Sequence, residues 1–143
     1  MTTNNVSKVT PQAQAARWPW WLLVGDWLVL LLFVFVGQRD HAISGPGALP
    51  SLLNTAVSLG LPWTVAAFVL GAYRLRSDPG WRTWLGRTLN AWLVAAPLGL
   101  LLRALLRNQD AIPVIFILIA MSIGGLMMVG WRMVAYWLAA RRA

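Results

Sequence analysis

Four long apolar segments, separated by short stretches rich in glycine, proline and charged residues, constrain the fold of this chain more than any other feature. They cover about residues 18–37, 52–73, 84–106 and 112–131, and the last continues as a helix toward Arg141. Each has about the 20 residues that an α-helix needs to cross the hydrocarbon core of a bilayer. Only 11% of the residues are charged, against roughly a quarter in soluble domains. The sequence therefore predicts an all-α, polytopic membrane protein built as a bundle of four transmembrane helices.

The remaining residues leave no room for a second domain. Residues 1–16 are polar and lack a periodic apolar face, so we predict a disordered N-terminal tail followed by a four-helix transmembrane domain over residues 17–143. In an alternative interpretation the first segment is a cleavable signal peptide, because it follows Lys8 and Arg17. The apolar run is longer than the core of a usual signal peptide, and no Ala-x-Ala site follows it directly. These features favour a retained helix.

The distribution of cations predicts the orientation. With four crossings, nine of the twelve Lys and Arg residues fall on the side that holds both termini and the second loop, and only Arg39, Arg103 and Arg107 fall on the other. Because cytoplasmic loops carry the excess of Lys and Arg, both termini should be cytoplasmic, in the plasma membrane. Seven of the ten tryptophans fall on the same side, as in an interfacial aromatic belt. The net charge of +8 follows from this topology, so we expect the lipid bilayer as partner and no nucleic acid.

Asp26 is a carboxylate within the first predicted span, where an ionisable residue needs a charged partner or a hydrated cavity. It lies roughly 12 Å along the helix from Trp18, and Arg132 reaches a similar depth on the fourth helix, whereas Arg103 lies near the opposite end of the third. We therefore predict an ion pair between Asp26 and Arg132. It is either a structural pair that joins the first helix to the fourth or part of a proton or cation relay. The lack of a second acid nearby favours the structural interpretation.

Pro62 and Pro97 both fall near the middle of a predicted span. A proline inside a helix removes a backbone donor, frees the carbonyl four residues earlier and kinks the helix. Two kinks at matched depth can open a central cavity, although such prolines also occur in helices that bind nothing. Four polar side chains either line that cavity or form hydrogen bonds between helices: Asn90, Ser58, Thr64 and Ser122.

A second polar group, Arg39, Asp40 and His41, follows the first span at the outer mouth of the predicted bundle. His41 is the only histidine, and the chain has no cysteine. A metal ion or haem group would need further ligands that this chain scarcely offers. We expect no metal and no cofactor. His41 is interpreted as a hydrogen-bonded interfacial residue, with pH sensing as the alternative.

Small residues recur at the spacing of one helical turn on the third and fourth helices. They are Ala91, Ala95 and Gly99 on the third, and Ala120, Gly124 and Gly125 on the fourth. Small residues at this spacing let helix backbones approach closely. The contact can lie within one chain or between chains, so a homo-oligomer and an assembly with other membrane proteins both remain open.

Several short motifs occur in a fixed order along the four segments. They are Asp26, Phe33, Gly37-Gln38-Arg39-Asp40-His41, Leu100-Leu101-Leu102-Arg103 and Gly130-Trp131-Arg132. Over about Trp21 to Arg132 this arrangement resembles the prokaryotic membrane family called domain of unknown function 3054. The resemblance implies a small multi-pass membrane protein and implies no activity, cofactor or partner.

The residue inventory argues against an enzyme, because the chain offers no Ser-His-Asp set, no pair of intramembrane carboxylates and no glycine-rich phosphate loop. Two functions remain. The first, slightly favoured, is a small permeation or transport protein in which Asp26 and the kinked helices line a path for an ion or small solute. The second is a non-catalytic assembly or partner subunit of a larger membrane complex. Permeation requires a hydrated cavity that reaches Asp26, whereas a structural subunit should have Asp26 paired and sealed.

Overall fold

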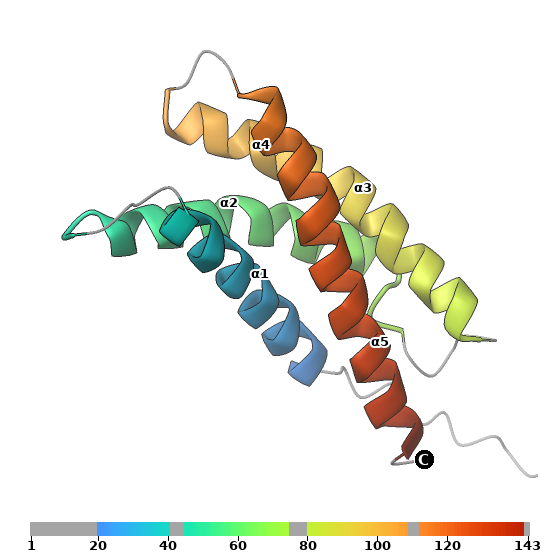
Figure 1. Cartoon of the computed structure of the whole chain (residues 1–143). Coiled ribbons are helices and arrows are strands. Elements are labelled where there is room, and N and C mark those ends of the chain that lie inside the picture. Colours follow the sequence, from blue (N-terminus) through green and yellow to red (C-terminus); the bar gives the residue numbers. More distant parts are fainter. Residues whose placement is uncertain (1–19, 41–44, 75–79, 109–111, 142–143) are drawn as a thin grey trace, which may run out of the picture.

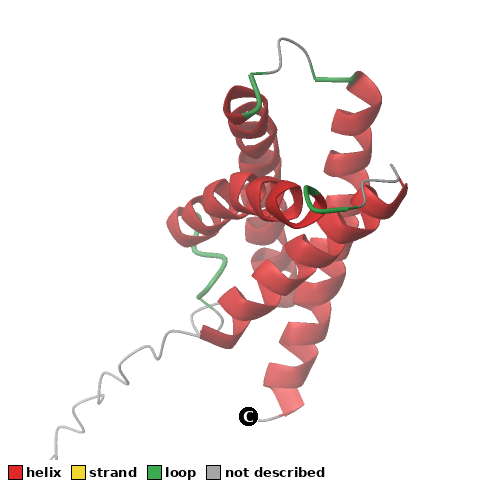
Figure 2. Cartoon of the chain, turned by 90° about the vertical axis from the view of Figure 1, so that its left-hand side faces the viewer, coloured by secondary structure: helices red, strands yellow, loops and turns green. Residues whose placement is uncertain are grey.

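A computed structural model describes residues 20–40, 45–74, 80–108 and 112–141. It contains helices α1 (Trp20–Asp40), α2 (Ala48–Val69) and α3 (Trp81–Leu106), followed by α4 (Val114–Ile119), the π-helical turn η1 (Ala120–Gly124) and α5 (Gly125–Arg141). The last three run on as one rod, so four rods are long and apolar enough to cross a membrane (Figure 1). The described part of the chain contains helices, turns and loops only (Figure 2). The predicted all-α, four-helix membrane fold is confirmed, and the predicted tail, residues 1–16, lies outside the described residues.

The helix bounds differ from the predicted spans at several ends, and α1 continues to Asp40 rather than ending near residue 37. α2 begins at Ala48 rather than near residue 52, because Pro50 falls in the first turn, where a missing N–H is tolerated. α3 begins at Trp81 rather than near residue 84. α2 ends at Val69 rather than near residue 73, because Gly71 adopts a left-handed conformation with φ of 70°. Hydropathy, on which the predicted boundaries rest, does not detect a glycine cap.

The four rods surround one core, and each packs on its neighbours in chain order. α1 contacts α2 and α5, and α3 contacts α2 and α5 (Figures 1 and 2). Many large apolar side chains are exposed on the outer surface, as expected of a surface that faces lipid. α4 has no fully buried residue, although Phe116 and Ile117 pack against the core, and the closer contacts of the fourth rod with α1 and α3 lie in η1 and α5. The core runs along the bundle, from Leu22 and Ala135 at one end to Val34 and Leu100 toward the other.

Close packing of α2 and α3 depends on small residues of α3. Ala91, Ala95 and Gly99 are all buried. A methyl group built on Gly99 would lie 3.0 Å from the Ser58 carbonyl oxygen and 3.0 Å from the Leu59 Cα. The predicted role of this small-residue repeat is therefore present within a single chain.

Tryptophans fill the spaces that glycines leave on α1 and on the fourth rod. The Trp131 ring lies where a methyl group on Gly25 would be, and the Trp92 ring lies against Gly124 and Gly125. The Trp92 indole N–H also donates to the Met121 carbonyl at 3.0 Å. A π-helical turn disturbs the regular backbone pairing, so this bond provides a donor where the helix is irregular. The glycines of the fourth rod thus accommodate a ring from α3.

Candidate functional site

The predicted ion pair between Asp26 and Arg132 is present, and both side chains are completely buried. Asp26 lies on α1 and Arg132 on α5, which pack side by side at the end where Trp21 and Trp131 meet edge to face, 6.2 Å apart. The guanidinium binds the carboxylate in a bidentate manner, with Nε 3.1 Å from Oδ1 and Nη2 2.5 Å from Oδ2. A bidentate pair fixes both the distance and the orientation of the two helices at this level.

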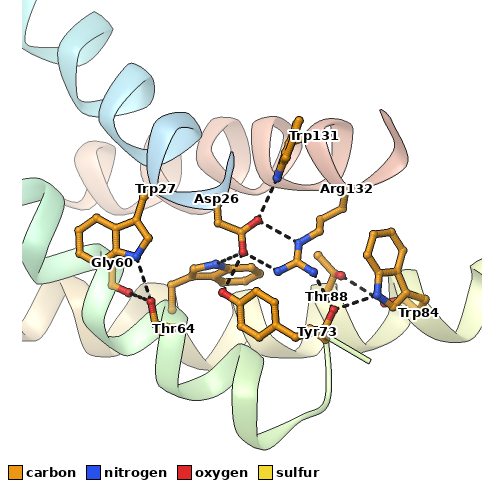
Figure 3. A network of polar contacts seen from close by, with 11 residues as sticks. Asp26, Trp27, Gly60, Thr64, Tyr73, Trp84, Thr88, Trp131 and Arg132 are labelled. Atoms are coloured by element: carbon orange, nitrogen blue, oxygen red, sulfur yellow. Dashed lines mark hydrogen bonds and ion pairs between the residues drawn. The ribbon is translucent and has the colours of Figure 1, made fainter. Parts of the chain in front are cut away.

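Three aromatic side chains complete the surroundings of the carboxylate (Figure 3). The Trp63 indole N–H and the Tyr73 hydroxyl each donate to Oδ2 at 2.9 Å, and the Trp131 indole N–H donates to Oδ1 at 3.0 Å. Asp26 thus accepts five hydrogen bonds from α2, the α2–α3 connection and α5, while an ionised carboxylate has about four lone-pair positions. Both carboxylate oxygens are therefore fully hydrogen-bonded by groups of the protein itself.

The side of the Arg132 guanidinium that faces away from Asp26 also forms a hydrogen bond. Nη1 donates to the Ala72 carbonyl at 2.6 Å, and the Trp84 indole N–H donates to the same carbonyl at 2.8 Å. The left-handed Gly71 turns the chain after α2, and Ala72 N–H donates back to the Ala67 carbonyl at 2.8 Å. This helix-ending motif therefore places a backbone acceptor in the core.

Aromatic rings surround the same guanidinium. Its central carbon lies 5.5 Å from the Trp63 ring centre, 4.8 Å from that of Tyr73 and 5.5 Å from that of Trp84. Cation–π attraction is strongest when water is excluded, as it is at this completely buried side chain. Asp26, Trp63, Tyr73, Ala72, Trp84, Trp131 and Arg132 are called the buried network below.

Sequence reasoning finds the two charges of the buried network and misses its aromatic donors. The positions of Trp131 and Trp84 near helix ends predict an interfacial belt instead. Trp63 carries a usable signal, because a tryptophan well inside a span must find a buried acceptor for its N–H. The Ala72 carbonyl carries none, since its role depends on the turn at Gly71.

Ser58 and Thr64 of α2 each donate to a carbonyl of their own helix. Ser58 donates to the Asn54 carbonyl at 2.7 Å. Thr64 donates to the Gly60 carbonyl at 2.7 Å and accepts from the Trp27 indole N–H of α1 at 3.2 Å (Figure 3). Asn90 and Ser122 are exposed on the outside of the bundle. The structure therefore does not bring these four predicted polar residues together around one cavity.

The two prolines also lie in different environments, and both helices continue through them. The carbonyl that Pro62 frees, at Ser58, faces Gly99 of α3 in the tightly packed interior. Pro97 and Leu93, whose carbonyl it frees, are both exposed on α3. The structure does not place both prolines beside a shared interior space.

The remaining predicted residues lie at the opposite end of the bundle from the buried network. The guanidinium of Arg103 lies over the Phe116 ring at 4.7 Å, and Arg107 donates to the Ser51 hydroxyl. Arg39 is exposed beside Phe35. Of the predicted outer mouth, Asp40 ends α1, whereas His41 lies outside the described residues.

A missed residue, Gln38, joins α1 to α2 at this end. It is buried, and in the amide orientation that pairs both of its polar atoms, its oxygen accepts from Leu52 N at 2.8 Å and from the Ser51 hydroxyl at 3.2 Å. Its nitrogen then donates to the Ala48 carbonyl at 3.3 Å. The amide thereby satisfies backbone groups in the first turns of α2.

Chemically, the buried network can hold helices together but offers little to a reactant. Its acid and its base neutralise each other, and neither side chain is exposed. Within the described ranges, no group of three or more His, Cys, Asp or Glu side chains is placed to hold a metal ion.

Comparison with known proteins gives a family match. A family model described as "Protein of unknown function (DUF3054)" matches residues 23–135, a range that includes both members of the ion pair. This confirms the resemblance seen in the sequence motifs. No curated protein and no solved structure matches the chain.

Proposed function

The chain belongs to the DUF3054 family, and from that membership and the geometry of its core we propose that it is a non-catalytic component of a membrane assembly. In this proposal the buried network makes the four helices one rigid unit, and the outer surface binds partners. The observation that carries the proposal is the sealed state of Asp26, which is completely buried and accepts five hydrogen bonds.

A permeation role would need Asp26 to exchange contacts with a moving ion or proton. Its two oxygens already accept more bonds than they have lone-pair positions, so an entering cation would have to displace a donor. Displacing Arg132 would leave a buried charge without its partner, which costs about 3 to 5 kcal/mol. The positions of Pro62 and Pro97 add no support for a path. The carbonyl that Pro62 frees is packed against Gly99, and Pro97 is exposed on the outside of α3.

Ion flux through reconstituted vesicles tests the proposal. Purified protein in liposomes should pass protons, sodium, potassium and chloride no faster than protein-free liposomes under imposed gradients. The matched variant is Asp26→Asn with Arg132→Gln, which removes both charges and should also show no flux. A wild-type flux that this variant loses, while circular dichroism shows its helices intact, would support permeation instead.

The assembly itself is tested in native membranes. A photo-reactive residue at Leu93, which is 58% exposed on α3, and others at exposed positions of α1 and α2 should yield crosslinked proteins. Crosslinks to lipid alone at every exposed position would contradict the proposal.

We further propose that the protein resides in the plasma membrane with both termini and the second loop in the cytoplasm. The nine-to-three division of cations supports this orientation. Because the chain lacks cysteine, single cysteines at Ser44 and Ser77 can be probed with an impermeant thiol reagent on intact cells. We expect labelling at position 44 and none at position 77, and the opposite pattern would reverse the orientation.

A further inference from the structure

One stripe of α3 carries polar groups on the outside of the bundle. Its residues are spaced by three or four positions and so lie along one side of the helix. This α3 outer face consists of Thr83, Gly86, Asn90, Leu93, Pro97 and Leu101; Gly86 is half-buried and the others are exposed.

Asn90 is the first polar group on the α3 outer face. Its side-chain amide has no hydrogen-bond partner among the residues that the structure describes. α3 runs from residue 81 to residue 106, so Asn90 lies roughly 5 Å from the middle of the helix along its axis. An amide at that depth faces acyl chains, which neither donate nor accept hydrogen bonds.

The Leu93 carbonyl is the second polar group on the α3 outer face. Pro97 lacks the N–H that would bond to this carbonyl in a regular helix, and both residues are exposed. The carbonyl that Pro62 frees on α2, at Ser58, lies instead in the interior, where it packs against Gly99. The Asn90 amide and a carbonyl without its regular helical donor thus lie within one turn of each other on the α3 outer face.

Gly86 adds room for a close neighbour. A methyl group built at this position would meet no atom within 4 Å, so nothing in the described part of the chain requires a glycine there. A glycine one turn from a polar residue is a common arrangement at contacts between transmembrane helices.

We propose that the α3 outer face is the contact between two copies of this chain, with the two α3 helices packed in parallel about a two-fold axis normal to the membrane. A primary amide is both donor and acceptor, so Asn90 pairs with the same residue of a second copy without any other group. Two-fold contacts bring each residue near the axis against its own copy, which suits a self-complementary side chain. Gly86 lets the backbones approach closely enough for these short side chains to meet.

Other exposed surfaces lack this combination. The exposed side of α4, η1 and α5 is apolar apart from Ser122 and the last residue of α5, Arg141, and a serine hydroxyl can bond to a carbonyl of its own helix. Asn54 of α2 is also exposed, but it lies one turn from Ser51 at the end of the bundle, and the proline-freed carbonyl one turn further along, at Ser58, faces Gly99 in the interior. Lipid therefore suffices as the neighbour at these places.

This inference rests on the proposed function and names one partner for the assembly. Energy transfer between donor- and acceptor-labelled copies in liposomes, over a range of protein-to-lipid ratios, should show a dimer. Asn90→Leu should weaken its association by about fivefold or more, while Asn90→Gln, which keeps an amide, should restore most of it. The matched control Asn54→Leu should leave association unchanged. A chain that stays monomeric at all ratios, or a dimer that Asn90→Leu does not weaken, overturns the inference.

Cysteine crosslinking in native membranes is a second test of the proposed dimer. In this cysteine-free chain, Leu93→Cys should form a covalent dimer on mild oxidation, whereas Leu126→Cys on α5 should not. A photo-reactive residue at position 93 that captures a different membrane protein overturns the second-copy inference and leaves the proposed assembly function in place. Flux through vesicles, by contrast, would overturn the proposed function whatever the dimer measurement shows.

Discussion

Asp26 and Asn90 are both polar side chains well inside a transmembrane helix, yet the chain treats them in opposite ways. Asp26 faces the core and accepts five hydrogen bonds from four residues. Asn90 faces outward and has no partner in the described part of the chain. The charged group, which is the costlier one to leave in hydrocarbon, is satisfied within one copy, and the neutral amide is left for a neighbour. The difference separates groups that hold the bundle together from a group that joins bundles.

The largest expected effect comes from breaking the ion pair. Asp26→Asn and Arg132→Gln should each lower the free energy of unfolding by about 3 to 5 kcal/mol, because each leaves one buried charge without its partner. The double variant should recover part of that loss. Unfolding by denaturing detergent in bicelles measures the cycle. Purely additive losses would mean that the two residues do not stabilise the fold as a pair.

Removing one neutral donor from the buried network should cost less. Tyr73→Phe deletes the hydroxyl that donates to Asp26 and should lower the free energy of unfolding by about 1.5 to 3 kcal/mol, the usual range for a hydrogen bond to a charged group. Tyr136→Phe is the matched control, because Tyr136 packs its ring on Trp84 outside the carboxylate's reach. Equal losses in the two variants would show that the Tyr73 hydroxyl is not a significant donor to the carboxylate.

Crowding the α2–α3 contact tests the interior carbonyl that Pro62 frees. Gly99→Ala should lower the free energy of unfolding by about 1 to 3 kcal/mol, because the new methyl group would press on the Ser58 carbonyl and the backbone of Leu59. Gly130→Ala places a methyl group in open space and should be neutral or slightly stabilising. The same unfolding assay compares the two alanines, and a stable Gly99→Ala protein would show that the helices can separate slightly here.

The smallest effect on the free energy of unfolding is expected at Asn90, the outward-facing residue that was compared with Asp26. In dilute micelles that hold one copy each, Asn90→Leu should change the free energy of unfolding by less than about 0.5 kcal/mol, since the side chain is exposed and no side-chain hydrogen bond within the described chain is lost. The measurement is unfolding at a high detergent-to-protein ratio. A loss of several kcal/mol would place Asn90 among the residues that hold the single bundle together, contrary to its exposed position.

The number of crossings and the pairing of Asp26 with Arg132 were predictable from the sequence for a simple reason. Crossing a membrane depends on the length of a local apolar run, and depth follows from a rise of about 1.5 Å per residue. Both quantities are properties of a segment by itself. Depth alone was therefore enough to choose Arg132 over Arg103 as the partner of the carboxylate, and the direct contact between the two buried side chains agrees with that choice.

The direction in which each side chain faces around its helix axis was decided only by the tertiary structure. Whether Asn90 faces the core or the lipid, and whether Trp63, Tyr73 and Trp131 converge on one carboxylate, depends on how four helices rotate against one another. Those rotations are set by close contacts such as Trp131 on Gly25 and Ser58 on Gly99, which join residues far apart in the chain. The turn at Gly71 likewise brings the Ala72 carbonyl to Arg132. The sequence by itself thus determined which groups lie at the same depth, and packing determined which of them meet, because depth is a local property and helix rotation is a collective one.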